Sequence, residues 1–505
     1  MSEIRINQIS LNNIKLDQQF LVRDGNSSGD TRANAGERTG VVTPYMTINA
    51  YPVGDYLTSF NLDLSGFLPV INFSFYAGNP TFISVNYPKD GDIVSLYIAS
   101  PDGYYKPIRM DFNILSVKSS VSSKYSDTGD ASDPDGSQFR FSISGECRIP
   151  SLYTPIIKSF KNKSSYETLL EISQDLDLGF STNESTTEDV MTWICPNYSY
   201  YDFIQEVCIR SYKDDNSSFF DCWIDPYYNL NFINLGSQFS YDGIVQDEIV
   251  YAEGYSSNEN YKPNVSVDGS AQLKLKKAFL LLKNLSDKGV YPFTINGYTL
   301  ISNSGTNVNK TGYIVNIGFY DENLEEEDPQ KKYINYDIES ITGKDIYNGQ
   351  ILQKGRGNDD EYKREKRREW LGILNRKDET GGVHLNYLHS KYQNLINYND
   401  CTKFSLKVEL DGYFGGIYKG QVVPVQIQVG KVNLRFENVG NSTSGKVTSD
   451  KGKKIDNFLS GNYVVMSMEI SWSPSGFKQL LYLSKRDWIV NRAGSLPKAF
   501  PFVLE

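Results

Sequence analysis

The stretch Tyr387–Asp487 decides the fold that we predict for this 505-residue chain. It opens with a helical pattern, YLHSKYQNLINYN (387–399). Segments follow in which apolar and polar residues alternate, as in half-buried strands, and Gly, Pro and Asn residues separate them. These segments are FSLKVEL (404–410), VVPVQI (422–427), YVVMSMEI (463–470) and FKQLLYL (477–483). Short strands joined by such turns favour a small closed barrel over an open sheet.

The N-terminal part of the chain repeats this order of segments. GDIVSLYI (91–98), IRMDFNILSV (108–117) and FRFSISGE (139–146) follow one another as GQVVPVQI (420–427), YVVMSMEISW (463–472) and FKQLLYLSKRD (477–487) do. The alternation matches, although few residues are identical. Because unrelated β-meanders often look alike, the pattern leaves duplication and coincidence both open. On this pattern we predict two barrels.

Further strands are predicted on the N-terminal side of this repeat. Thr47–Tyr51, Phe60–Leu64 and Val70–Tyr76 have strand patterns, and Ile4–Leu11 is one more candidate strand before a polar arm. The acidic segment DTGDASDPDG (127–136) reads as a loop, because its carboxylates and glycines do not follow the spacing of a calcium-binding EF-hand.

The region between the two predicted barrels has both helical and strand patterns. Ser164 followed by Glu167 matches a helix start with a capping box, and Gly179 stands at a suitable C-cap position. A second helix is predicted over Tyr200–Arg210. Phe219–Ile224 and Leu230–Ile233 then predict two strands, which completes a compact α+β unit.

The segment after this unit is harder to assign. Gln272–Leu285 fits either a helix or a pair of strands, since its polarity contrast does not settle the period. Phe293–Ile301 and Gly312–Tyr320 predict strands. The charged run Asp359–Trp370 predicts an exposed helix, for which a solvated face is favoured over contact with phosphate.

The predicted fold class is mainly β with α+β. Two small tandem-type β-barrels are joined by an α+β domain and an inserted or variable segment. The predicted domains are an N-terminal arm (1–40), a first β-barrel (41–155), an α+β domain (156–240), a variable α+β segment (241–385), a second β-barrel (386–490) and a C-terminal tail (491–505).

Composition narrows the classes of function. The net charge of −10 argues against a general nucleic-acid clamp. The five cysteines are odd in number and contain no CxxC, so neither a disulfide framework nor a zinc site is indicated. The opening MSEIRINQIS lacks the features of a signal peptide, and no apolar run is long enough to span a membrane. We expect no stable membrane association. The 36 tyrosines favour large contact surfaces.

No catalytic, cofactor-binding or metal-binding residue is predicted. His384 and His389 are five positions apart, which suits neither a helical ligand pair nor an HExxH motif. The aromatic cluster Tyr198, Tyr200, Tyr201 and Phe203 is explained more simply by packing than by sugar stacking. We therefore expect a scaffold with no cofactor and no enzymatic activity.

Several of these segments together resemble a known family. They are YETLLEISQDLDLGF (166–180), Thr192-Trp193-Ile194, YDFIQEVCIRSY (201–212), FFDCWIDPYYNLNFIN (219–234), HSKYQNLINYNDCTKFSLKVEL (389–410), GQVVPVQI (420–427) and GNYVVMSMEISW (461–472). The chain resembles the central baseplate hub proteins of contractile-tail bacteriophages, a superfamily that includes the late control D proteins and the VgrG hubs of type VI secretion. Residues 240–385, the N-terminal arm and the acidic loop depart from the family pattern.

The resemblance implies a homotrimer whose six barrels adapt a sixfold tail tube to a threefold central spike. It implies as partners the tail tube protein, the spike protein and other baseplate proteins, with transient passage of DNA that is not specifically bound. The implied location is the virion tail baseplate, assembled in the host cytoplasm. Two other classes stay open at this point: a Tyr-rich carbohydrate-binding adhesin and a virion-associated cell-wall hydrolase with unrecognised paired acids.

Overall fold

A computed structural model describes the chain in a series of ranges. They are 5–7, 44–77, 82, 85–98, 108–123, 137–214, 217–239, 278–283, 290–302, 313–321, 333–337, 366–374, 383–384, 386–402, 404–413, 417–429, 454–455 and 459–485. The acidic loop 127–136, the tail 491–505 and all of the N-terminal arm except residues 5–7 lie outside these ranges.

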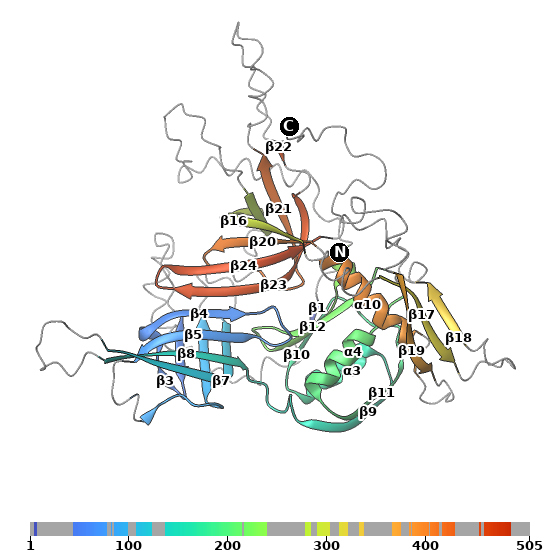
Figure 1. Cartoon of the computed structure of the whole chain (residues 1–505), viewed down its shortest axis with the longest axis horizontal. Helices are drawn as coiled ribbons and strands as arrows, with labels where there is room; N and C mark the ends of the chain where they lie inside the picture. The colour runs from blue at the N-terminus through green and yellow to red at the C-terminus, as the bar shows by residue number, and fades with distance from the viewer. Residues whose placement is uncertain are drawn as a thin grey trace, which may run out of the picture.

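Most of the described strands belong to one antiparallel sheet of 15 strands, beside which lies a smaller α+β region (Figure 1). The mainly β prediction with α+β parts is confirmed. The large sheet consists of an N-terminal unit and a C-terminal unit, which lie one above the other in Figure 1.

The N-terminal unit contains seven strands that pair in the order β4-β5-β8-β7-β6-β2-β3. The strand patterns near the N-terminus therefore correspond to real strands, except that the predicted strand 47–51 turns at Asn49 and Ala50, both at positive φ. The bounds are β2 (Tyr45–Ile48), β3 (Tyr51–Pro52), β4 (Leu57–Asp63), β5 (Val70–Ala77), β6 (Ile93–Ile98), β7 (Ile108–Ser123) and β8 (Ser137–Cys147).

The C-terminal unit pairs its strands in the order β16-β20-β24-β23-β21-β14-β15. Every strand pairing of one unit recurs in the other, and all of these pairings are antiparallel. The equivalent strands are β2 and β14, β3 and β15, β4 and β16, β5 and β20, β6 and β21, β7 and β23, and β8 and β24. The bounds are β14 (Ala278–Lys283), β15 (Val290–Thr294), β16 (Gly297–Ser302), β20 (Phe404–Asp411), β21 (Val422–Val429), β23 (Gly461–Ser473) and β24 (Gly476–Ser484); β22 (Lys454–Ile455) adds to β21.

The duplication extends to a local irregularity. In the N-terminal unit the ladder between β7 and β8 is interrupted at Leu115, and in the C-terminal unit the ladder between β23 and β24 is interrupted at Met466. Such a bulge bends its strand and is a defined structural feature. The shared bulge lets residues of the two units be matched one by one, and it favours duplication over the coincidence that the sequence left open.

The two units are joined because β23 pairs with β4. The first part of β23 pairs with β21, and the part after the bulge turns to β4, with Glu469 opposite Asp63 and Trp472 opposite Phe60. Among the described residues the strand pairs of neither unit close into a ring, so the closed barrels that we expected are not seen there. In the N-terminal unit the edge strand β4 pairs with β23 of the other unit, which leaves it unavailable for closing a barrel.

The α+β region contains a four-stranded sheet, a two-stranded ribbon and two main helices. The capping box predicted at Ser164 and Glu167 is present at the start of α3. The sheet order is β1-β10-β13-β12, and β9 pairs with β11. The bounds are β1 (Arg5–Asn7), β9 (Pro155–Lys163), α3 (Ser165–Asp175), β10 (Gly179–Thr182), β11 (Met191–Ser199), α4 (Tyr200–Arg210), β12 (Phe220–Ile224), β13 (Asn229–Asn234) and α5 (Leu235–Phe239).

The prediction that Gly179 caps α3 is wrong. The helix ends at Asp175, and Asp177 takes the left-handed conformation with φ of 53°. Gly179 instead begins β10, where a Cβ atom would lie 2.0 Å from the side-chain oxygen of Asn229 in the neighbouring strand. The glycine is required by this close approach of two strands.

The predicted C-terminal helix is α10 (Tyr387–Thr402), which packs on α4. Several hydrogen bonds join it to the α+β region. Asn394 donates to the carbonyls of Ile209 and Ser211 and accepts from the backbone N–H of Phe220. Gln393 and Asn397 donate to the carbonyl of Ser218. α10 therefore fastens the α+β region to β20 of the C-terminal unit, which follows it in the chain.

The segment 241–385 contributes to two sheets. β14, at the ambiguous stretch 272–285, is a single strand between β15 and β21. The predicted strand Phe293–Ile301 is divided at Ile295 between β15 and β16. β17 (Tyr313–Asp321), β18 (Tyr333–Asp337) and β19 (Lys366–Leu374) form a separate three-stranded sheet. The helix predicted over Asp359–Trp370 is wrong from Lys366 onward, because β19 pairs in parallel with β17; residues 359–365 lie outside the described ranges.

Substitution of Gly179 by Ala is expected to destabilise the chain by about 1–3 kcal/mol, because the added methyl overlaps Asn229. Chemical denaturation of the Gly179→Ala, Asn229→Ala and double variants measures the effect. The loss caused by Gly179→Ala should be smaller when Asn229 is already Ala, since the overlap is then removed. Equal losses in both backgrounds would contradict this packing.

Candidate assembly interface

The seam between β4 and β23 has an apolar inner side and a polar outer side. On the inner side the ring of Phe60 stacks on Trp472 at 6.4 Å and meets the edge of Phe477 at 5.9 Å. Leu62 and its partner Ile470 are fully buried. On the outer side Asn61 donates to a carboxylate oxygen of Glu469 at 3.4 Å. Burial of these rings and aliphatic side chains stabilises the seam.

Lys419 connects the seam to the α+β region. Its ammonium lies 3.1 Å from a carboxylate oxygen of Asp221 and 4.5 Å from the centre of the Trp223 ring. It also donates to the carbonyl of Ser65, just after β4, at 3.3 Å. The next residue, Gly420, has φ of 82°, and a Cβ there would lie 3.0 Å from Trp223. One buried cation thus contacts β12, the β4–β5 turn and the C-terminal unit at once.

The N-terminal unit is tied to the α+β region by a second set of contacts. The backbone N–H of Ile224 donates to the carbonyl of Phe67 at 2.8 Å, and the ring of Phe67 meets Tyr201 edge-on at 5.2 Å. The hydroxyl of Tyr228 accepts from the backbone N–H of Asp111 at 2.8 Å. The α+β region therefore supports both units from one side.

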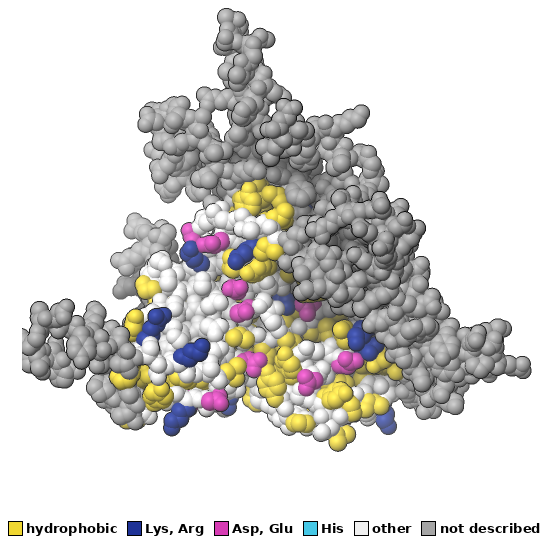
Figure 2. All heavy atoms as spheres, in the orientation of Figure 1, with side chains coloured by type: hydrophobic (Ala, Val, Ile, Leu, Met, Phe, Trp, Pro, Cys, Tyr) yellow, Lys and Arg dark blue, Asp and Glu magenta, His cyan; other side chains and the backbone are white. Residues whose placement is uncertain are grey.

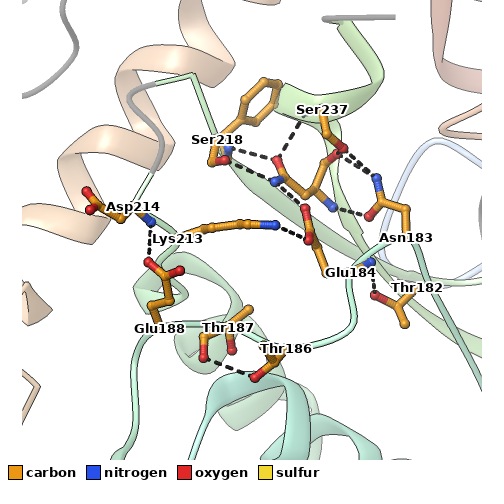
Figure 3. Close-up of polar contacts among 12 residues, drawn as sticks. Thr182, Asn183, Glu184, Thr186, Thr187, Glu188, Lys213, Asp214, Ser218 and Ser237 are labelled. Carbon is orange, nitrogen blue, oxygen red and sulfur yellow. Dashed lines mark hydrogen bonds and ion pairs between the residues drawn. The ribbon is translucent and has the colours of Figure 1, made fainter. Parts of the chain in front are cut away.

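A polar network fixes the loop after β10, as Figure 3 shows. Asn234, at the end of β13, donates to Glu184 at 2.7 Å and to the hydroxyl of Ser218 at 3.0 Å. Asn183 donates to the carbonyl of Asn234 and accepts from its backbone N–H. Lys213 pairs with the other oxygen of Glu184. Both oxygens of this buried carboxylate are occupied, which indicates a structural role.

Asp189 is a second buried carboxylate in the same loop. It accepts from the N–H and hydroxyl of Ser165 at 2.8 and 2.6 Å, from the hydroxyl of Thr187 and from the N–H of Tyr212. Burial raises its pKa, and these hydrogen bonds, above all those from Ser165, oppose the rise. The group anchors the start of α3 to the loop and to the end of α4.

A groove of about 540 Å³ crosses the seam. It is lined mainly by Ser and Asn side chains on β4, β5, β7, β8, β23 and β24, with the cations Lys118 and Lys478 at its sides. Figure 2 shows a largely white surface with scattered basic and acidic residues where the N-terminal unit lies in Figure 1. Neither a carboxylate nor a histidine is among the residues that line it. The paired acids of a glycosidase are therefore not present in this groove.

An apolar surface is exposed elsewhere, on the ribbon of β9 and β11. Ile157 is 84% exposed, and Ile194 and Tyr198 are also exposed. They lie on strands that pair with each other but, among the described residues, with no further strand. Exposed apolar residues that lie close together are common at contacts between proteins.

The residues weighed from the sequence do not converge on a site. His384 is buried among the rings of Trp193, Tyr212 and Tyr387. His389 lies on α10. Within the described ranges no group of His, Cys, Asp or Glu side chains is placed to hold a metal ion. The five cysteines are all buried thiols without disulfide bonds.

The aromatic cluster around Tyr200 is mostly packing, as the sequence indicated. Tyr200 and Phe203 are buried, and Tyr200 donates its hydroxyl proton to Asp175 at 2.6 Å. Tyr201 is half-buried against Phe67, whereas Tyr198 is half-exposed.

Sequence reasoning missed the residues that make the seam. Trp472 and Phe60 were recognised only as strand residues, because nothing local marks a pairing between residues about 400 positions apart. Lys419 was not singled out either. It precedes Gly420, and a glycine at that place indicates a turn but not the contacts of the residue before it.

No protein-family model and no curated protein sequence matches the chain. A tail protein from Neisseria meningitidis MC58 is similar in structure, with 10% identity, coverage of 88% of this chain and 96% of that one, and a TM-score of 0.43. The 43 kDa tail protein of prophage MuSo2 from Shewanella oneidensis has 8% identity, coverage of 88% and 98%, and a TM-score of 0.44.

The chain is similar to phage tail proteins. A third similar structure is the E. coli c3393 protein, described as a component of the type VI secretion system with structural similarity to the T4 tail proteins gp27 and gp5. It has 8% identity, coverage of 90% of this chain and 80% of that one, and a TM-score of 0.37. No helix in the described part of the chain is long and apolar enough to cross a membrane.

Replacement of Lys419 by Met keeps the length of the side chain but removes its charge. We expect a loss of about 1–3 kcal/mol in the free energy of unfolding, because Asp221 and the carbonyl of Ser65 lose their partner. Lys478→Met is the matched control, since its ion pair with Glu409 is exposed, and it should leave the unfolding midpoint unchanged. Similar midpoints for both variants would contradict the role of Lys419.

Proposed function

We propose that the chain is a structural baseplate hub of a contractile tail or a related injection machine. The observation that carries this proposal is the repeated unit: two units share the same seven-strand topology and are joined edge to edge through β4 and β23. A chain with two like units can assemble as a trimer with six like units. Duplication thereby supplies near-sixfold surface from threefold symmetry.

Such a trimer adapts two partners of different symmetry. Its six units would face the tail tube protein, and its threefold side would face the central spike protein, with other baseplate proteins at the periphery. The location would be the tail baseplate of a virion, reached by assembly in the host cytoplasm. The exposed apolar ribbon of β9 and β11 provides additional surface for such contacts.

A central opening in the trimer would let DNA pass without binding. The net charge of −10 for each chain repels phosphate, so transient passage is favoured over capture.

We propose no reaction for this hub. The two buried carboxylates of the α+β region, Glu184 and Asp189, are used by hydrogen bonds within the fold. Neither the carbohydrate-binding adhesin nor the cell-wall hydrolase is favoured by a specific observation. Tyr200 is buried, and the seam groove lacks paired acids.

The mass of the purified chain in solution tests the hub directly. At micromolar concentration, native mass spectrometry and light scattering should give three times the monomer mass. A monomer over the whole accessible concentration range would contradict the proposal. A trimer that also releases reducing ends from host envelope would overturn the non-enzymatic part alone.

A further inference from the structure

The seam is formed by one strand from each unit, and each of these two strands has an equivalent strand in the other unit. β4 and β23 pair with each other to form the seam. Their equivalents are β16 and β7. Within the described ranges β16 pairs only with β20, and the part of β7 after its bulge pairs only with β8.

Equivalent residues on these edges differ in burial. Leu62 on β4 is 0% exposed, whereas its equivalent on β16, Leu300, is 39% exposed although it lies opposite the fully buried Leu406. The bulge residue Leu115 on β7 is 53% exposed, whereas its equivalent Met466 on β23 is half-buried. An exposed strand edge with apolar side chains invites pairing with another strand.

The residue match follows from two rows of paired residues that cross the units. In the N-terminal unit the row is Leu62, Ile71, Gly145 and Ile114. In the C-terminal unit it is Leu300, Leu406, Leu483 and Val465. The bulge follows Ile114 in the first row and Val465 in the second, which fixes the alignment without reference to sequence identity.

We propose that β16 of one copy of the chain pairs with β7 of the next copy and repeats the β4–β23 seam between chains. In the seam Leu62 lies opposite Ile470 and Asn61 opposite Ser471. Transferred by the residue match, Leu300 lies opposite Ser119 of the next copy and Thr299 lies opposite its Ser120. The strands run antiparallel, as they do within the chain.

The side chains at these positions can reproduce part of the internal seam, although Ser119 and Val121 stand where the seam has Ile470 and Trp472. Tyr298 is equivalent to Phe60 and Phe139 is equivalent to Phe477, so the edge-to-face aromatic pair of the seam recurs between copies. Thr299 and Lys118 take the places of Asn61 and Glu469, a polar pair on the outer face. The partner of each edge is thus a second copy of this chain, through a heterologous contact that closes when its rotation fits a ring.

This inference rests on the trimer of the proposed function and specifies how its subunits meet. Its test is a disulfide between Thr299→Cys and Ser120→Cys in the full-length chain under mild oxidation. Directly opposed residues of an antiparallel pair have Cα atoms about 4.5–5.5 Å apart, within disulfide range. The native cysteines are buried and leave a low background. Non-reducing gels should show covalent species up to three chains and no larger.

Two further double-cysteine variants serve as controls, the first for disulfide formation and the second for the register of the two strands. Asn61→Cys with Ser471→Cys should form its disulfide within one chain and migrate as a monomer. Thr299→Cys with Ser116→Cys places one thiol four residues away along β7, roughly 13 Å, and should not link. A ladder beyond three chains would overturn the closed ring, because it indicates an open filament.

A separate variant tests the edge without cysteine chemistry. Leu300→Asp places a charge on the exposed edge of β16 and should convert the trimer to a monomer that keeps the far-UV circular dichroism spectrum of the wild-type chain. Ile157→Asp, which changes a still more exposed residue on the separate β9–β11 ribbon, should leave the trimer intact.

The outcomes separate this inference from the hub. A trimer that persists in Leu300→Asp and does not link through residues 299 and 120, while the control at 61 and 471 links, overturns the proposed edge pairing and leaves the hub standing. A wild-type chain that is monomeric at every concentration counts against both.

Discussion

The structure depends on the pairing of β23 with β4, residues that are about 400 positions apart in the sequence. The ladder between β23 and β24 has a bulge at Met466; before it β23 pairs with β21, and after it with β4. Phe60, Trp472 and Phe477 then pack on the inner side.

The seam also explains why a duplicated sheet is useful. Each unit has two different strands through which it can pair with another unit. One is β4 or its equivalent β16, and the other is β23 or its equivalent β7. Because one kind pairs with the other, the units can join in series. Within the chain one such joint is already made, and the α+β region holds it through Lys419, Tyr228 and α10. The pairing of β4 with β23 within the chain has the geometry that the proposed pairing between chains would repeat.

Much of the strand pattern could be predicted from the sequence, because alternating apolar residues report local burial. The predicted strands Val70–Tyr76 and Ile93–Ile98 are observed as Val70–Ala77 and Ile93–Ile98, and the helix predicted from about Tyr200 to Arg210 is observed there. The pairing of β4 with β23 could not be predicted, since it joins the edges of two strands that are far apart in the sequence. β14–β16 were not recognised as equivalents of β2–β4, and Gly179 was assigned to a cap because its contact with Asn229 is made across two strands. The domain boundaries proposed from the sequence remain predictions.

Hydrogen exchange resolved at single residues compares the two equivalent edges most directly. In a dilute monomeric sample, the edge amides of β4 over Phe60–Asp63 should be protected, while those on the free edge of β16 over Tyr298–Ile301 should exchange quickly. In the assembled sample both edges should be protected. Rapid exchange at β4 in the monomer would contradict the internal seam, and with it the account of how this chain is built.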